Sequence, residues 1–201
     1  MLTLVLPFAG SAGKTRLHAS PRVRGRVAHA MFRDVLAACL AVGRTRVVTP
    51  DEDAASAALA AGAEVVADPG GGQGAAVRAA LAGIGSGEVL VVNADLPCAR
   101  PRDLRALLAA TPAGGVGLVE AADGTTNALS LPAPEAFAPL YGPGSAARFR
   151  AHAAALGLAA VSVPLPNLAR DVDTLADLER VERWAGARTR ACLAELEGSL
   201  V

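Results

Sequence analysis

The sequence predicts an α/β fold in which helices cover both faces of a mostly parallel sheet. Three observations favour this class. Short apolar segments alternate with segments of helical character up to about residue 110. The apolar segments are continuous runs rich in Val and Leu, as expected of strands that are buried on both faces. Hydrophobic residues make up 52% of the 201 residues, so the chain can bury a sizeable core.

The first half of the chain contains four expected strands, each followed by an expected helix. Ser20 and Pro21 mark the start of the first helix, because Ser is favoured at the N-cap and Pro at the first helical position. Gly43 and Gly62 are expected to end the first two helices. The expected strands are 2–6, 46–49, 64–67 and 88–92, and the expected helices are 21–42, 51–61, 73–81 and 101–109.

The alternation of strands and helices changes after residue 111. Strands are expected at 115–120 and 128–131 with no full helix between them, then a helix at 145–156 and a strand at 159–164. Thr174 and Asp177 form a variant of the capping box, which predicts a last helix from Thr174 to about residue 197. No linker or internal repeat interrupts the chain, so residues 1–201 are expected to form a single domain.

Composition excludes several classes of partner. The 19 basic and 19 acidic residues cancel, no basic stripe is present, and a single Trp and Tyr argue against a surface that stacks nucleic-acid bases. No uncharged apolar run reaches the about 20 residues needed to span a membrane, and no signal peptide is recognisable. Three widely spaced cysteines fit reduced thiols. We therefore expect a cytoplasmic protein that binds neither nucleic acid nor membrane; its oligomeric state is not indicated.

Three carboxylates are candidate metal ligands. Asp95 follows the apolar strand at 88–92, and Asp171 and Asp173 come much later in the chain, just before a capped helix. Oxygen ligands from two distant segments can converge on a hard cation such as Mg²⁺, which grips nucleotide phosphates at strand ends in many α/β proteins. Alternatively, Asp95 and Asp173 each cap a turn or helix, and Asp171 is a solvated neighbour.

The loop after the first strand is a candidate phosphate-binding segment. Residues 10–15 end in Gly-Lys-Thr, as a P-loop does, but Phe8 stands where that motif needs its first glycine. The next helix also starts only at Ser20, which disfavours a P-loop NTPase. Lys14 and Arg16 are cations among small residues, so the loop can still bind phosphate. The alternative is an ordinary surface loop.

Three further polar segments could bind ligand. The glycine loop 70–72 leads into Gln73, whose amide can both donate to and accept from a nucleotide base. Loops 123–128 and 141–145 place hydroxyls and amides near glycines, which suits a small anion, with Ser145 at a helix N-terminus. The alternatives are a plain mobile turn at 70–73 and an N-cap role for Ser145. His18, His29 and His152 show no ligand spacing.

Five motifs occur together in one order along the chain: residues 13–17, 93–97, 126–129, 141–145 and 171–174. This combination resembles the 2-phospho-L-lactate guanylyltransferase family of coenzyme F-420 biosynthesis; in some bacteria the acceptor of these enzymes is phosphoenolpyruvate instead. The resemblance runs from near the N-terminus to about Leu178. It implies a Rossmann-like three-layer nucleotidyltransferase fold, related to the molybdopterin guanylyltransferases.

The resemblance implies roles for the charged residues. Asp95, Asp171 and Asp173 would hold Mg²⁺. Lys14 and Arg16 would face the triphosphate of GTP. Asp95, Asp173 and Lys14 would be the catalytic groups.

The resemblance also implies roles for neutral residues. Thr126, Gly142 and Ser145 would bind the carboxylate and phosphate of the acceptor. Gln73 would bind the nucleotide, at a position where the family usually has Asn beside the base. The larger departure is Phe8, because members usually carry a lysine there.

The reaction expected from this resemblance is transfer of GMP from GTP to phosphoenolpyruvate or 2-phospho-L-lactate, with release of pyrophosphate. A phosphomonoester has a second pKa of about 6, so its attacking oxygen needs no general base. One alternative is a nucleotidyltransferase for another acceptor, such as a molybdopterin or a sugar phosphate. The other, motivated by Phe8, is a nucleotide-binding protein without catalysis.

Overall fold

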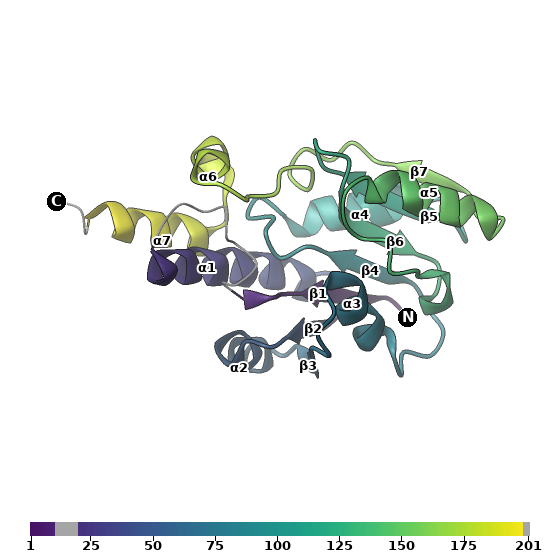
Figure 1. Ribbon diagram of the computed structural model, residues 1–201, viewed down its shortest axis with the longest axis horizontal. Helices are drawn as coiled ribbons and strands as arrows, with labels where there is room; N and C mark the ends of the chain where they lie inside the picture. The colour runs from purple at the N-terminus through teal and green to yellow at the C-terminus, as the bar shows by residue number, and fades with distance from the viewer. Residues whose placement is uncertain (11–19, 199–201) are drawn as a thin grey trace.

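The computed structural model describes residues 1–10 and 20–198. Within them, a seven-stranded sheet forms the centre of the molecule, with the strand order β3-β2-β1-β4-β6-β5-β7 (Figure 1). In chain order the strands are β1 (Thr3–Pro7), β2 (Arg44–Thr49), β3 (Glu64–Ala67), β4 (Val89–Val92), β5 (Val116–Glu120), β6 (Thr126–Leu131) and β7 (Ala160–Ser162). The helices are α1 (Pro21–Leu40), α2 (Glu52–Ala60), α3 (Gln73–Leu81), α4 (Pro101–Ala110), α5 (Ser145–Ala155), α6 (Leu175–Val181) and α7 (Ala187–Gly198), with short 3-10 segments η2 (Pro134–Ala136) and η3 (Glu182–Trp184).

The sheet is mostly parallel, as predicted. β1 pairs in parallel with β2 and β4, β2 pairs in parallel with β3, and β5 pairs in parallel with β7. β6 runs antiparallel to both of its neighbours, β4 and β5. The first residues of β6 therefore lie at the edge where β4 ends.

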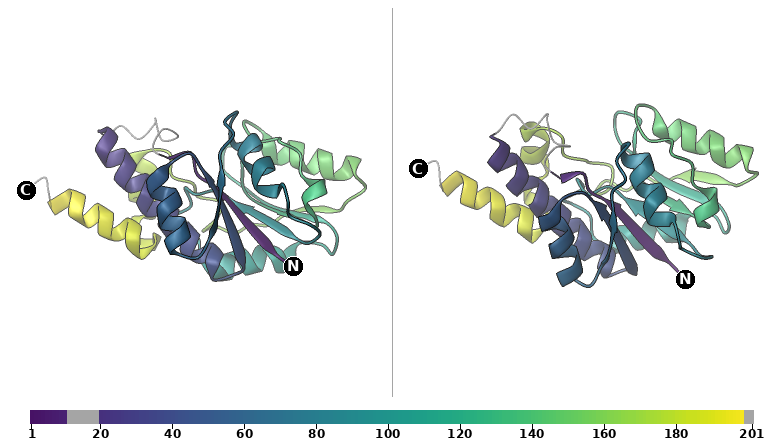
Figure 2. Two further views of the ribbon diagram at one scale, coloured as in Figure 1. Left: turned by 90° about the horizontal axis from the view of Figure 1, so that it is seen from below. Right: turned by 60° about the horizontal axis from the view of Figure 1, so that its bottom comes forward.

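Helices cover both faces of the sheet, which confirms the three-layer α/β fold. The side chains of β4 alternate between two apolar clusters: Leu90 and Val92 pack into one, and Val89 and Val91 into the other. The first cluster includes residues of α1, α2 and α4, and the second includes residues of α3 and α5. Figure 2 shows α3 and α5 on the face of the sheet opposite α4. A third cluster joins the outer side of α1 to α6 and α7. None of the described helices is both long and apolar enough to cross a membrane.

Local signals explain most of the element boundaries in the first half. The Ser20 side chain accepts a hydrogen bond from Val23 N (3.3 Å), and Asp51 Oδ1 accepts one from Ala54 N (2.9 Å), so both helix starts are capped. Gly62, which follows α2, has φ +90°, as a helix-ending glycine should. Gly43 differs: α1 already ends at Leu40, and a Cβ at Gly43 would lie 3.0 Å from a methyl group of Leu4. Gly43 thus permits close packing rather than ending the helix.

The prediction of one continuous helix from Thr174 to about residue 197 is wrong. α6 begins after Thr174 with the predicted capping box but ends at Val181, and η3, Ala185 and Gly186 separate it from α7. The buried Asp34 carboxylate of α1 accepts hydrogen bonds from the backbone N of Thr189 (2.9 Å) and from its hydroxyl (2.8 Å). A Cβ at Gly186 would lie 2.1 Å from Asp34 Cγ. A carboxylate from a distant helix therefore sets the start of α7.

Candidate active site

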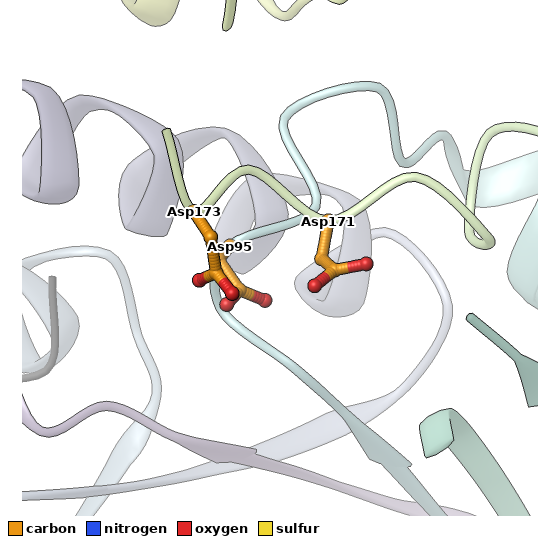
Figure 3. A group of neighbouring side chains, drawn as sticks. All are labelled: Asp95, Asp171 and Asp173. Carbon is orange, nitrogen blue, oxygen red and sulfur yellow. The ribbon is translucent and has the colours of Figure 1, made fainter. Parts of the chain in front are cut away.

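The three candidate metal ligands lie close together at the end of β4. Asp95 follows β4, and Asp171 and Asp173 lie in the segment that leads into α6. One carboxylate oxygen from each residue lies within 4.8 Å of the other two. Figure 3 shows Asp171 and Asp173 pointing to the same side of their segment. The backbone N of the buried Val172, which lies between them, donates to Asp95 O (3.1 Å) and joins the two segments.

These carboxylates form a cluster of like charge that is only partly exposed. Burial raises the pKa of Asp171, and a hydrogen bond from Asn127 lowers it. The neighbouring charges of Asp95 and Asp173 raise it again, so the pKa of Asp171 lies above its ordinary value. Three carboxylate oxygens at this spacing are the hard donors that bind divalent cations such as Mg²⁺. The cluster can therefore hold a metal ion, whose charge would offset the repulsion.

A cavity of about 270 Å³ adjoins this cluster. Asp95 and Asp173 line it together with the glycine loop and the segment after β1. The predicted nucleotide-binding residue Gln73 lies on its wall, at the start of α3. The lining residues are Pro7, Phe8, Ala9, Gly10, Ala28, Met31, Asp68, Gly72, Gln73, Ala76, Asn93, Ala94, Asp95 and Asp173.

A chain of side-chain amides connects Gln73 to the carboxylate cluster. Gln73 Nε2 donates to Asn93 Oδ1 (2.7 Å), and Asn93 Nδ2 lies 3.5 Å from Asn127 Oδ1. Asn127 Nδ2 donates to Asp171 Oδ1 (3.2 Å). Asn93 and Asn127 belong to motifs that sequence reasoning singled out, but it gave neither residue a role. The available signal was an Asn at the end of β4 and another at the start of β6.

Two of the predicted acceptor-binding residues contact each other. Ser145 Oγ donates to Thr126 Oγ1 (3.1 Å), and both residues are buried. Thr126 is the first residue of β6 rather than part of a loop. An N-cap role for Ser145 is wrong, because Gly144 (φ +69°) is the N-cap of α5 and Ser145 is the first helical residue. The pair lies next to the amide chain, since Asn93 Nδ2 also donates to Thr126 O (3.3 Å).

The third predicted acceptor-binding residue, Gly142, lies in a loop that Arg148 holds. The Arg148 guanidinium donates to three backbone oxygens of this loop: Leu140 O (2.7 Å), Tyr141 O (3.1 Å) and Pro143 O. Gly142 has φ +108°, a conformation that favours glycine. Arg148 thus fixes the loop from the first turns of α5, and sequence reasoning missed it.

Phe8, the departure from the family pattern, is a core residue that also lines the cavity. Its side chain is 7% exposed, stacks on Phe32 (4.6 Å between ring centroids) and meets the ring of His29 edge-on (5.4 Å). His29 is in turn paired with Asp51 (3.1 Å). Phe8 therefore gives the cavity an apolar wall. The predicted phosphate-binding residues Lys14 and Arg16 lie outside the described residues.

Comparison with known proteins identifies the class that this fold and acidic cluster define. The family model of the MobA-like NTP transferase domain matches residues 22–195, so the chain belongs to this family of nucleotidyltransferases. A putative nucleotide-diphospho-sugar transferase from Desulfovibrio desulfuricans shares the fold, with a TM-score of 0.75 and 16% identity over 98% of this chain and 95% of its own.

Within the nucleotidyltransferases, this chain is similar to guanylyltransferases. The chain is 39% identical over 191 residues to the phosphoenolpyruvate guanylyltransferase of Nocardia farcinica, which covers 88% of this chain and 82% of the relative. It is 34% identical over 212 residues to the 3-phospho-D-glycerate guanylyltransferase of Phenylobacterium zucineum, which covers 98% of this chain and 97% of the relative. These relatives confirm the resemblance to guanylyltransferases of small phospho-acids.

Proposed function

We propose that this nucleotidyltransferase transfers GMP from GTP to the phosphate of phosphoenolpyruvate and releases pyrophosphate, as a step of coenzyme F-420 biosynthesis. The observation that carries the proposal is the cluster of Asp95, Asp171 and Asp173, two of which line the cavity, in a chain that is 39% identical to a phosphoenolpyruvate guanylyltransferase. Residues 1–201 act as a single domain in this proposal. A cytoplasmic location and the absence of nucleic-acid and membrane partners stay predictions from the sequence.

The carboxylate cluster is the proposed magnesium site. Its three oxygen donors come from two segments that Val172 N and Asp95 O join, so the spacing is built into the fold. Magnesium bound there would neutralise negative charge on the phosphates of GTP. Asp95 and Asp173 line the cavity directly, and Asp171 is oriented by Asn127.

The chemical step is a displacement at the α-phosphorus of GTP. An oxygen of the acceptor's phosphate forms the new bond to this phosphorus, the bond to the bridging oxygen of the β-phosphate breaks, and pyrophosphate leaves. The acceptor phosphate is largely dianionic above its second pKa of about 6, so no side chain has to remove a proton. The protein instead has to hold two anions in line against their repulsion.

Neutral groups and cations share this holding task. Thr126, Gly142 and Ser145 bind the carboxylate and phosphate of the acceptor in this proposal. Thr126 Oγ1 accepts from Ser145 Oγ, which leaves the Thr126 proton to be donated, and Arg148 holds the loop that contains Gly142. Gln73 binds the base. Lys14 and Arg16, outside the described residues, face the triphosphate.

Pyrophosphate release tests this function. The protein is incubated with GTP and Mg²⁺, and phosphoenolpyruvate, 2-phospho-L-lactate or 3-phospho-D-glycerate is added in separate reactions. Release that depends on phosphoenolpyruvate is the expected result. Release with another of the three identifies that acceptor instead. Pyrophosphate is the safer readout because the diphosphate product is itself reactive.

Phe8 motivates the competing hypothesis of a protein that binds GTP without catalysis, because the family's usual lysine is absent there. If the protein binds GTP without turnover because this cation is absent, Phe8→Lys should restore pyrophosphate release, although the variant also loses the stacking on Phe32. Turnover in the unaltered protein would sink the competing hypothesis. GTP binding with no turnover on the three phospho-acids, on a molybdopterin or on a sugar phosphate would support it.

A further inference from the structure

The amide of Gln73 has a fixed direction in this structure. Its Nε2 donates to Asn93 Oδ1 at 2.7 Å. Within the described residues no hydrogen bond reaches the other end of this amide, Gln73 Oε1. Gln73 and Asn93 both line the cavity, and with the Gln73 nitrogen engaged, the amide oxygen is the group that this side chain can offer to a ligand.

A backbone carbonyl sets this direction. Asn93 Nδ2 donates to Thr126 O (3.3 Å), and a peptide carbonyl can accept but never donate a hydrogen bond. Asn93 must therefore point its nitrogen toward β6 and its oxygen toward Gln73. The oxygen of Asn93 in turn obliges Gln73 to present its nitrogen, which leaves the Gln73 oxygen on the other side. The backbone carbonyl of Thr126 in β6 thus determines how both side-chain amides are oriented.

A fixed acceptor distinguishes guanine from adenine. Guanine carries donors at N1 and at its 2-amino group, next to each other on one edge. Adenine bound in the same position would turn its N1 acceptor and its C2–H group toward the Gln73 oxygen, because its only amino group, at C6, lies on the other side of N1. A polar group that is buried without a partner costs more binding free energy than one hydrogen bond contributes. Two acceptors that face each other would therefore weaken the binding of adenine.

We propose that Asn93 is a positioning residue that fixes Gln73 Oε1 as an acceptor for the N1 and 2-amino groups of guanine, and so makes the cavity selective for GTP over ATP. The inference rests on the proposed function, because it requires a guanine nucleotide whose phosphates lie at Asp95 and Asp173. Asp95, Asp173, Gln73 and Asn93 all line the same cavity, which makes this placement possible.

The test is the ratio of the dissociation constants for ATP and GTP, measured by calorimetry with Mg²⁺ and without acceptor. Asn93→Leu frees the Gln73 amide to rotate, and the ratio should fall by about tenfold, through weaker GTP binding. Gln73→Met removes the acceptor and should lower the ratio as much. The double variant should lower it no further, because both changes act through one oxygen.

Two control variants separate positioning from general damage. Asn93→Asp keeps an oxygen facing Gln73 Nε2, so its added charge should weaken both nucleotides while the ratio stays near that of the unaltered protein. Asn167→Leu removes an amide that donates to Asp103 Oδ2 (3.0 Å), outside the cavity lining, and should leave the ratio unchanged.

Several outcomes would overturn the inference. They are an unaltered protein that binds ATP as well as GTP, an unchanged ratio in Asn93→Leu and Gln73→Met, and an equal loss of both nucleotides in Asn93→Leu. Failure of the proposed function is visible separately, since pyrophosphate release is measured with acceptor and nucleotide binding without it. If the protein prefers GTP through Gln73 but transfers no GMP, the role of Asn93 is supported and the proposed transferase function is contradicted.

Discussion

The two groups of polar residues at the end of β4 differ in what holds them together. Asp95, Asp171 and Asp173 are like charges within 4.8 Å of one another, and their repulsion helps to raise the pKa of Asp171. Thr126 and Ser145 are neutral, buried and hydrogen-bonded to each other. The first group consists of like charges that two distant segments bring together, whereas the members of the second group are joined by a hydrogen bond to each other.

This difference separates function from stability. Removing a charge from the acidic cluster should not destabilise the fold, because repulsion between like charges is reduced, but it should impair binding and turnover. Removing a hydroxyl or the Arg148 guanidinium should disturb the local structure, and acceptor binding should weaken as a result. The following variants, in decreasing order of expected effect, test this contrast.

Asp173→Asn should lower kcat by about a hundredfold or more, because one charged oxygen ligand of the proposed magnesium site is lost. Steady-state pyrophosphate release measures this, and circular dichroism should show an unchanged fold. Glu179→Gln, a charge removal at an exposed residue of α6, is the matched control and should keep full activity. Full activity in Asp173→Asn would contradict the metal assignment.

Arg148→Met should raise the KM for the acceptor by about tenfold, with the KM for GTP unchanged, because hydrogen bonds to three loop carbonyls are lost at about 1 kcal/mol each, partly replaced by water. Arg148→Lys should lie between, since an ammonium group cannot span all three oxygens. An equal rise in both KM values would instead indicate a general loosening of the structure.

Ser145→Ala should lower the free energy of unfolding by about 1 kcal/mol, since the buried Thr126 hydroxyl loses its donor. For a chain of this size that corresponds to a fall in Tm of about 2–4 °C. Differential scanning calorimetry measures the change, and Ser145→Thr, which keeps a hydroxyl, serves as a comparison. An unchanged Tm would show that the hydroxyl pair does not stabilise the fold.

Asp171→Asn should raise Tm slightly without metal and abolish the further rise that Mg²⁺ gives the unaltered protein. The pKa of Asp171 is raised in the folded state, so the folded protein binds this proton more tightly than the unfolded chain. Its contribution to stability is therefore present below the unfolded pKa and lost as pH rises through the raised one. Thermal melts from pH 4 to 8 should show this loss in the unaltered protein and not in the variant; parallel curves would contradict it.

The sequence predicts an element boundary well where residues near it in the chain determine that boundary, and poorly where distant residues do. β3 and α3 begin and end at the predicted residues, because glycine and proline positions mark their ends locally. β6 begins earlier than predicted, at Thr126, where its pairing with β5 decides the start. The break before α7 depends on Asp34, far away in the chain, so no local pattern shows it.

The same distinction holds for the site. The convergence of Asp95 with Asp171 and Asp173 is confirmed, because the segment after β4 and the segment before α6 are joined by the hydrogen bond from Val172 N to Asp95 O. Asn93, Asn127 and Arg148 were missed, since their importance lies in partners that only the folded chain brings near. The site roles themselves remain predictions for the variants above.

The reversed direction of β6 has a consequence for how such an enzyme can diversify. The glycine loop and the cavity wall belong to the parallel β3-β2-β1-β4 part of the sheet, and the hydroxyl pair and the Arg148 loop belong to β6 and α5. Two separately connected parts of the chain thus meet at one edge. On the proposed roles, acceptor choice would depend on β6 and α5, and nucleotide binding on the segments that follow β1, β3 and β4. The two preferences could then change through substitutions in different parts of the chain.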